Sequence, residues 1–320
     1  MSSAQRAPRA VVFAYHDVGV RCLRTLLAGG VDVPLVVTQT DSPGELIWFD
    51  SVARHAAWHD IEVITPEDPN AAAVVERVRA AKPDFLFSFY YRSMLGGALL
   101  LLPGRGAYNL HGSLLPKYRG RAPVNWAVLH GESETGATLH AMAPKPDAGD
   151  IVGQQAVPIL PDDTAVEVFR KVTVAAELVL DRCLPELIAG TAPHHAQDLT
   201  AGSYFGGRSA RDGAIDWRHG VRTAHNLIRA VAPPYPGAFT EAGGTALRIL
   251  RSLPVNLPAA MPLPPAGAPV LFWHAGALHA LCHDGALKVL QFEFGADISS
   301  AENFHRRFGE RVLPLRPFME

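Results

Sequence analysis

The residues best suited to chemistry in this chain lie in the segment Asn109-Leu110-His111-Gly112-Ser113-Leu114-Leu115-Pro116. A short strand that ends there points Asn109 and His111 to the same face, because side chains alternate along a strand. Asp147 follows in a segment rich in Pro and Gly that is typical of a loop. At the carboxyl end of a strand, an amide, an imidazole and a carboxylate can stabilise an oxyanion and move a proton. We predict that Asn109, His111 and Asp147 are catalytic.

The elements that hold these residues are predicted from the apolar pattern of the first 193 residues. Strand-like runs alternate with helical runs, which is typical of a parallel sheet covered on both faces. A long helix follows, with Thr164 and Glu167 as a capping box and Gly190 as its stop. The strands are expected at residues 10–15, 33–38, 85–89 and 107–110, and the helices at 19–28, 51–59, 71–81, 123–129 and 164–189. The predicted fold class is α/β, with a Rossmann-like parallel sheet domain at residues 1–193.

The character of the chain changes after the long helix. Residues 194–211 are rich in Gly, Ser, His and Thr, and we interpret them as a linker. Short strands with turn signals then favour a small barrel at residues 212–320. We expect a helix at 221–231, strands at 247–250, 270–273, 277–282 and 287–292, and a flexible proline-rich interruption at 254–269.

The composition is that of a globular protein with no strong charge preference. Of the 320 residues 48% are apolar, and the formal net charge is −2. This balance offers no general attraction to nucleic acid or to an anionic membrane. The longest aliphatic run, residues 98–102, is too short to span a bilayer, and no signal-peptide core follows the start. Cys22, Cys183 and Cys282 are scattered, and we interpret them as reduced, buried thiols. We expect a cytoplasmic protein.

Two other chemistries are disfavoured by spacing. Residues 14–19 read Ala-Tyr-His-Asp-Val-Gly, where a nicotinamide-binding domain would have G-x-G-x-x-G, and no P-loop is present. His111, His140 and Asp147 could converge on a metal, but no H-x-x-x-H or H-E-x-x-H spacing supports such a site. We expect no metal. A non-catalytic binding module of the same fold is disfavoured by the intact set of Asn109, His111 and Asp147.

The residues around Asn109 resemble those of the formyltransferase family that uses 10-formyltetrahydrofolate. Residues 109–126 carry its N-x-H-G-S-L-L-P pattern, and further similar blocks lie at 12–17, 87–92, 131–136, 147–149 and 236–239. The resemblance implies a Rossmann-like domain followed by an OB-like barrel, with 10-formyltetrahydrofolate as cosubstrate. It implies direct attack of an amine on the formyl carbon, with Asn109 and protonated His111 as donors to the oxyanion. Asp147 would raise the pKa of His111 and could receive the proton of the amine.

Further residues are candidates for binding the two substrates, and for the folate contacts the resemblance implies which residues these are. A basic cluster of Lys117, Arg119 and Arg121 could bind a diphosphate or be solvated loop charge, and the adjacent catalytic loop favours the diphosphate. Arg208 and Tyr235, where the two domains are expected to meet, are further candidates for holding a nucleotide sugar. Tyr90 and Tyr91 could stack on the pteridine or serve only packing. The expected folate contacts are Ser93, Met94, Leu95, Arg121, Ala143, Pro144, Lys145, Pro146 and Asp147.

The blocks are most similar to formyltransferases that act on UDP-4-amino-4-deoxy-L-arabinose, which implies this nucleotide sugar as partner and a step in lipid A modification and polymyxin resistance. Methionyl-tRNA formyltransferases share the loop. Three features count against a methionyl-tRNA formyltransferase: Phe-Ala-Tyr-His-Asp at residues 13–17, Gly120-Arg121-Ala122 in the loop, and the lack of a basic surface. A dTDP-4-amino sugar stays open as the acceptor. Because the chain ends at Glu320, we expect formyl transfer without the oxidative decarboxylation of the bifunctional aminoarabinose enzyme, which a separate protein would supply.

Overall fold

The computed structural model describes residues 6–256 and 268–316, and the chain folds into two compact units. The first unit comprises Met1–Pro123, Glu134–Pro158 and Phe169–Gly206. The second comprises Val124–Ser133, Ile159–Val168 and Gly207–Glu320. The last change of unit, after Gly206, falls within the segment predicted as a linker.

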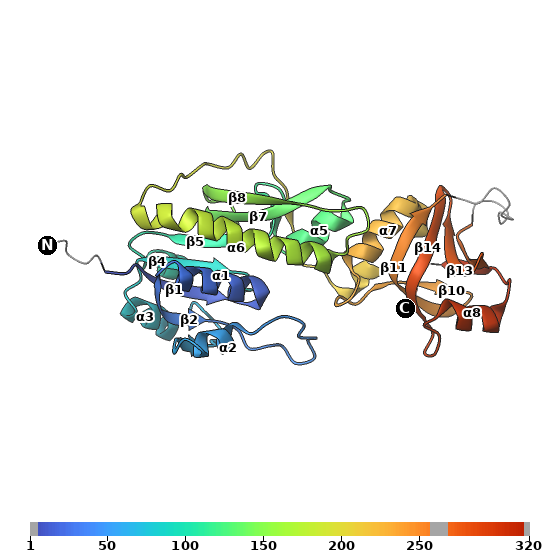
Figure 1. Ribbon diagram of the computed structural model, residues 1–320, viewed down its shortest axis with the longest axis horizontal. Helices are drawn as coiled ribbons and strands as arrows, with labels where there is room; N and C mark the ends of the chain where they lie inside the picture. The colour runs from blue at the N-terminus through green and yellow to red at the C-terminus, as the bar shows by residue number, and fades with distance from the viewer. Residues whose placement is uncertain (1–5, 257–267, 317–320) are drawn as a thin grey trace. The chain divides into compact units, whose positions relative to one another are not determined.

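The first unit is built on a sheet with the strand order β3-β2-β1-β4-β5-β7-β8 (Figure 1). The first five strands in this order are parallel, whereas β7 pairs antiparallel with β5 and with β8. Every residue of β4, with the sequence Phe-Leu-Phe-Ser-Phe, is buried, as expected for a sheet covered on both faces. The strands are β1 (Arg9–Ala14), β2 (Asp32–Val37), β3 (Glu62–Ile64), β4 (Phe85–Phe89), β5 (Ala107–His111), β7 (Glu134–Ala141) and β8 (Ile151–Pro158).

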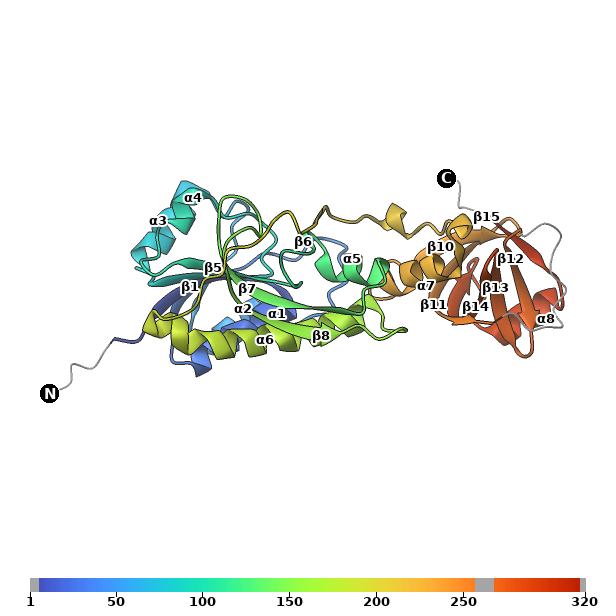
Figure 2. The same ribbon diagram turned by 90° about the horizontal axis from the view of Figure 1, so that it is seen from above.

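Helices cover both faces of this sheet. The helices α1 (His16–Ala28) and α6 (Ala165–Ala189) lie on one face, and α3 (Ala72–Ala80) and α4 (Gly97–Leu100) lie on the other (Figure 2). The helix α2 (Val52–Ala57) precedes β3, and a short ladder joins β6 (Arg119–Gly120) to β9 (Tyr204–Phe205). The α/β fold is therefore confirmed, although the predicted parallel sheet carries an antiparallel edge.

The ends of α6 agree with the predicted signals. The backbone N–H of Thr164 donates to the carboxylate of Glu167 at 2.7 Å, which forms one half of a capping box. The hydroxyl of Thr164 donates to the same carboxylate oxygen at 2.8 Å instead of capping the backbone. Gly190 follows the helix with φ of 73°, a conformation that few residues other than glycine adopt.

The second unit contains a closed barrel with the strand order β10-β11-β14-β13-β12-β15, which confirms the predicted barrel. Residues 257–267 of the predicted proline-rich interruption lie outside the described residues. Residues 254 and 255 were wrongly assigned to it, because they pair with β14. The elements of this unit are α5 (Pro123–Leu129), η1 (Ala210–Gly213), η2 (Trp217–His219), α7 (Gly220–Ala230), β10 (Ala238–Ala242), β11 (Thr245–Val255), β12 (Val270–His274), β13 (Ala277–Cys282), β14 (Gly285–Phe294), α8 (Ala301–Phe308) and β15 (Leu313–Arg316).

The three cysteines are free and buried, as predicted. Burial raises the pKa of the Cys282 thiol to about 12, so this side chain is an uncharged core residue at neutral pH. Among the described residues, none of the helices combines the length and the apolar character needed to cross a membrane.

Candidate active site

The strand β5 brings Asn109 and His111 to the carboxyl end of the parallel part of the sheet, facing Asp147. The Oδ1 atom of Asp147 lies 3.5 Å from Asn109 Nδ2 and 3.6 Å from His111 Nδ1. His140 on β7 is the register partner of Asn109, and its Nε2 atom lies 3.6 Å from the same oxygen. One carboxylate oxygen is thus surrounded by three nitrogen atoms.

The loop that delivers Asp147 begins at the opposite end of β5. Because β7 runs antiparallel, its last residue pairs with Tyr108, and Met142 donates its N–H to Ala107. The chain then turns back, and Asp147 adopts a positive φ of 50°. The side chain of Gln197 holds the turn through the carbonyl groups of Asp147 and Gly149, at 3.0 Å and 2.6 Å. The predicted folate residues Ala143, Pro144, Lys145 and Pro146 lie on this returning segment.

The tautomer of His111 follows from its neighbours. His111 is only 6% exposed, and its Nε2 atom lies 2.8 Å from the carbonyl oxygen of Tyr118. A carbonyl can only accept a hydrogen bond, so Nε2 carries the proton and the lone pair of a neutral ring is on Nδ1, facing Asp147.

Burial lowers the pKa of His111, and the opposing effects of Asp147 and of the Tyr118 carbonyl do not offset it. Asp147 does raise this pKa, as predicted, but burial outweighs it, so the prediction that His111 is cationic at neutral pH is wrong. The free imidazole is neutral at pH 7, with a basic nitrogen next to a carboxylate.

Asp147 itself stays ionised. Burial opposes the charge, but His111, His140 and the N–H of Gly120 hold the pKa of this carboxyl well below its usual range. The Gly120 N–H donates to Oδ2 at 2.9 Å. The carboxylate is therefore available to stabilise a positive charge that forms on His111.

His140 orients the amide of Asn109. Its Nδ1 atom lies 2.8 Å from the carbonyl oxygen of Ala141, so Nδ1 donates and Nε2 of the neutral ring accepts. Asn109 Nδ2 donates to this Nε2 atom at 3.1 Å. From the sequence, His140 was expected only as a possible metal ligand, a role that was disfavoured. The signal for its real position is weak: apolar Ala137, Leu139 and Ala141 alternate with Gly136, Thr138 and His140, which is the pattern of a strand.

The backbone of the loop after β5 forms hydrogen bonds with both His111 and Asp147, which we call the dyad. The Tyr118 carbonyl binds His111 and the Gly120 N–H binds Asp147, so Arg119 lies between the two contacts. Tyr118 has a φ of 57° and stacks on Phe205, with ring centroids 5.4 Å apart. The guanidinium of Arg119 is buried, and its Nε and Nη1 atoms are enclosed without a hydrogen-bond partner among the described residues.

The other predicted binding residues fall into two groups. Ser93, Met94 and Leu95 follow β4, the neighbour of β5, so they lie near the same edge of the sheet. Ser93 accepts a hydrogen bond from Gln39, Met94 is exposed and Leu95 is buried. Lys117 and Arg121 flank Arg119 in the first unit. Arg208 and Tyr235 belong to the second unit, where the Arg208 guanidinium lies 5.0 Å from the ring centroid of Trp126.

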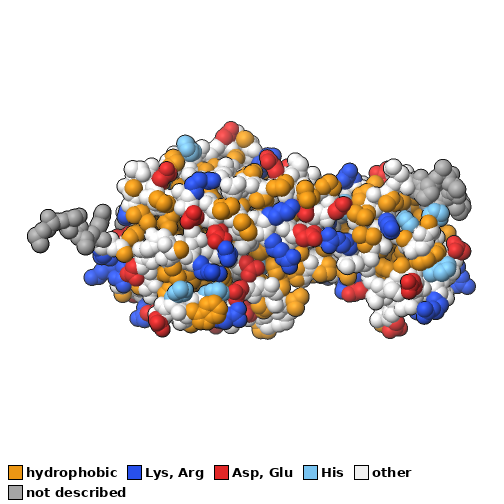
Figure 3. All heavy atoms as spheres, in the orientation of Figure 1, with side chains coloured by type: hydrophobic (Ala, Val, Ile, Leu, Met, Phe, Trp, Pro, Cys, Tyr) orange, Lys and Arg blue, Asp and Glu red, His pale blue; other side chains and the backbone are white. Residues whose placement is uncertain are grey.

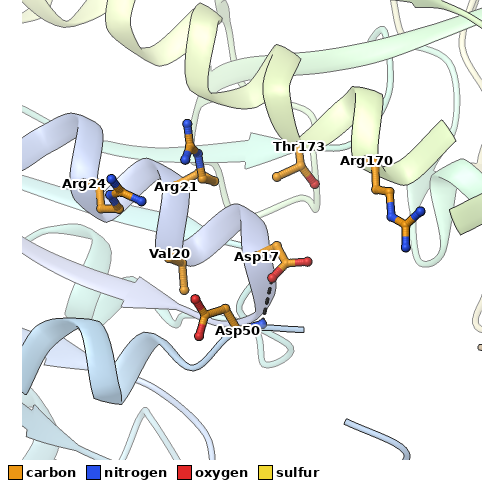
Figure 4. Close-up of a pocket in the computed structure, with 7 residues that line it drawn as sticks. All are labelled: Asp17, Val20, Arg21, Arg24, Asp50, Arg170 and Thr173. Atoms are coloured by element: carbon orange, nitrogen blue, oxygen red, sulfur yellow. Dashed lines mark hydrogen bonds between the residues drawn. The ribbon is translucent and has the colours of Figure 1, made fainter. Parts of the chain in front are cut away.

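A separate pocket of about 250 Å³ opens beside α1 and α6 (Figure 4). It is lined by Asp17, Val20, Arg21, Arg24, Asp50, Arg170 and Thr173. The carboxylate of Asp17 accepts a hydrogen bond of 2.7 Å from the Asp50 N–H, drawn as a dashed line in the figure. Its charges are mixed, and none of the predicted site residues lines it. Within residues 6–256 and 268–316, no group of three or more His, Cys, Asp or Glu side chains is placed to hold a metal ion.

An amide, a neutral imidazole and a carboxylate at the carboxyl edge of a mostly parallel sheet form a site suited to acyl transfer. The chain matches the family described as "Formyl transferase" over residues 13–184, and the family "Formyl transferase, C-terminal domain" over residues 208–309. The chain therefore belongs to the formyl transferase family, and it is an enzyme of that family.

Solved structures share the fold at low sequence identity. The N-formyltransferase of Helicobacter canadensis, in a complex with folinic acid and dTDP-3-aminofucose, is 20% identical with a TM-score of 0.67, over 90% of this chain and 100% of that one. The sugar 3N-formyl transferase WlaRD, in the presence of dTDP and 5-N-formyl-THF, is 19% identical with a TM-score of 0.68, over 92% of this chain and 100% of that one. A 4-N formyltransferase from Francisella tularensis is 19% identical with a TM-score of 0.59, over 72% of this chain and 91% of that one.

Proposed function

We propose that this enzyme transfers the formyl group of 10-formyltetrahydrofolate to the amine of a nucleotide-linked 4-amino sugar, UDP-4-amino-4-deoxy-L-arabinose. The observation that carries the proposal is the set of Asn109, His111 and Asp147, whose nitrogen and oxygen atoms meet at one point. The complexes of related folds with folates and dTDP-linked ligands support both substrate classes.

The chemistry is a direct acyl transfer. The neutral amine attacks the formyl carbon, a C–N bond forms and the bond from the formyl carbon to N10 of the folate breaks. The amine nitrogen must lose a proton, and the leaving nitrogen must gain one. Nδ1 of His111 takes the proton, because its lone pair is free, and then passes it to N10. The Asp147 carboxylate, 3.6 Å away, stabilises the imidazolium that exists between these steps.

Asn109 acts on the developing charge of the formyl oxygen. One N–H of its amide is used by His140 at 3.1 Å. The other faces Asp147 at 3.5 Å, too long for a strong hydrogen bond, so it can turn to the oxyanion. Loss of one such donor typically reduces the rate roughly 10²–10³-fold.

Arg119 supplies charge for the nucleotide. A buried guanidinium with unpaired nitrogen atoms is costly, and a phosphate would satisfy it. Lys117 and Arg121 belong to the same basic cluster, and Arg208 and Tyr235 are proposed as further nucleotide contacts. The folate is proposed to lie along Ser93, Met94, Leu95, Arg121 and residues 143–147.

In the cell, this reaction would be a cytoplasmic step toward aminoarabinose-modified lipid A and polymyxin resistance. A tRNA substrate is less well supported. On the face drawn in Figure 3, basic and acidic side chains are interspersed, whereas a polyanion needs many phosphate contacts.

The test offers the purified enzyme 10-formyltetrahydrofolate with three acceptors: UDP-4-amino-4-deoxy-L-arabinose, a dTDP-4-amino sugar and methionyl-tRNA. Mass spectrometry should detect a gain of one formyl group on the UDP sugar and none on the tRNA. Formylation of the tRNA alone would overturn the proposal. A preference for the dTDP sugar would keep the chemistry and replace the substrate.

A further inference from the structure

His16 occupies the place in the sheet where ligands of open α/β folds bind. It follows β1, and the chain proceeds from β1 to β2 on one side and returns to β4 on the other. In open α/β folds, ligands bind next to such a reversal of strand order, at the carboxyl ends of the strands. The proposed reaction does not use His16, which lies in the block at residues 12–17.

The backbone at His16 is strained. Its φ is 66°, in the left-handed region, where a residue with a Cβ atom is disfavoured by about 1–2 kcal/mol. Tyr90, at the end of the neighbouring strand β4, has a φ of 57°. Such strain persists where the surrounding structure enforces it, and it clusters at ligand sites.

Aromatic neighbours fix the position of the His16 ring. It stacks on Phe49 with centroids 3.8 Å apart, and it meets Trp48 and Phe169 edge-on at 4.6 Å and 4.7 Å. The N–H of Asp17 donates to His16 Nδ1 at 2.9 Å. Asp17 is in turn held by the Asp50 N–H (Figure 4). The residue is only 9% exposed.

These contacts leave one donor without a partner. Nδ1 accepts a hydrogen bond, so Nε2 of the neutral ring carries the proton, and it has no hydrogen-bond partner among the described residues. Burial lowers the pKa of His16 to about 3, with Arg92 acting in the same direction and Glu45 against it. The ring is therefore uncharged at any physiological pH. Phenylalanine would fill this aromatic cluster but would lose both the acceptor of the Asp17 N–H and the donor at Nε2. The first role is local, and the Nε2 donor is left for a ligand.

We infer that His16 is a substrate-binding residue, whose Nε2–H donates to an uncharged oxygen of the nucleoside part of the nucleotide sugar. The inference rests on the proposed function. The strands β1, β4 and β5 are adjacent, so His16 lies two strand spacings, roughly 10 Å, from His111. A sugar whose amine reaches His111 is shorter than this span, so the atom that meets His16 lies beyond the sugar. The side chains of Glu45 and Arg92 pair with each other, which leaves no net charge here for a phosphate.

The test measures the binding of UDP and of folinic acid to the full chain by calorimetry, in the wild type and in His16→Phe. The variant keeps an aromatic ring and removes the donor, so UDP should bind about 5- to 10-fold more weakly, as expected for one neutral hydrogen bond. Folinic acid affinity should change less than twofold. His16→Asn should bind UDP more tightly than His16→Phe, because asparagine tolerates a positive φ and offers an N–H.

His55→Phe is the matched control, because His55 is also buried against an aromatic ring, that of Trp58, but its Nε2 atom is already paired with Asp50 at 2.7 Å. It should leave UDP affinity unchanged. If His16→Phe is too unstable to measure, His16→Asn takes its place. The inference is refuted if His16→Asn weakens the binding of folinic acid as much as the binding of UDP. Equal UDP affinity in the wild type and His16→Phe also refutes it while the proposed function stands. Absence of UDP binding in the wild type would overturn both.

Discussion

Replacing Asp147 with asparagine separates the charge of this residue from its shape. Asp147→Asn keeps an oxygen that can accept the Gly120 N–H, which now lies 2.9 Å from Oδ2. It removes the negative charge that lies 3.6 Å from His111 Nδ1. The site should therefore stay folded and lose its ability to stabilise an imidazolium.

The expected magnitude follows from Coulomb's law. At an effective dielectric constant of about 20, two unit charges at the 3.6 Å separation of this pair interact by about 5 kcal/mol. Each 1.36 kcal/mol in the barrier is a factor of ten in rate. We expect kcat to fall roughly 10³-fold, with folate affinity nearly unchanged because the charge acts on the transition state.

Two measurements check this reasoning. Steady-state formyl transfer gives kcat, and NMR titration of the imidazole gives the pKa of His111 without any substrate. In the wild type this pKa should lie below the ordinary value of about 6.5, and it should fall further in Asp147→Asn. The control is Asp162→Asn, since Asp162 in the second unit lies 3.5 Å from another buried histidine, His225. A wild-type pKa above 6.5, or a loss of kcat smaller than tenfold, would refute the reasoning.

Four further predictions follow from individual contacts. His140→Phe removes the acceptor that orients Asn109, so kcat should fall about tenfold while folate binding, measured by calorimetry, is retained. Gly112→Ala places a methyl group against the Tyr90 hydroxyl and should lower kcat at least tenfold, whereas Gly97→Ala, with open space around it, should have no effect in the same assay. Phe304→Ala empties a fully buried position in the second unit and should lower its free energy of unfolding by about 3–5 kcal/mol in denaturant titration. The pKa of the Asp147 carboxyl is lower in the folded state than in the unfolded state. Its charge therefore stabilises the fold above the unfolded pKa of about 4, and this stabilisation is lost as the pH falls. The free energy of unfolding of Asp147→Asn should decrease less than that of the wild type between about pH 5 and pH 2.

The buried strands could be predicted from the sequence because they are continuous apolar runs. β4 lies where it was expected, at Phe85–Phe89, and the helix α5 has the predicted bounds of Pro123–Leu129. The antiparallel edge was missed because β7 contains Thr, Gly and His among its buried positions, so its alternation is weak. One of these polar residues, His140, orients the amide of Asn109, which accounts for a polar residue at a buried position of β7.

The meeting of Asn109, His111 and Asp147 could be anticipated from strand alternation and from the family pattern. The protonation of the site could not, because it depends on burial and on backbone groups. Whether Asp147 or desolvation determines the pKa of His111 is decided by the surrounding residues, which no spacing rule describes. The tautomer is set by the carbonyl of Tyr118, a residue whose side chain suggests no catalytic role.

Arg119 connects the catalytic dyad of His111 and Asp147 with the proposed phosphate site. The peptide groups on either side of it hold His111 and Asp147, while its guanidinium is buried with two nitrogen atoms unpaired. A phosphate that binds this guanidinium would also constrain residues 118–120, the segment whose backbone positions His111 and Asp147. Phosphate binding would in this way be coupled to the geometry of His111 and Asp147. The phosphate of a substrate, although distant from the reacting amine, would then affect kcat as well as affinity. In the formylation of short amines that lack a phosphate, we therefore expect low kcat values even at saturation.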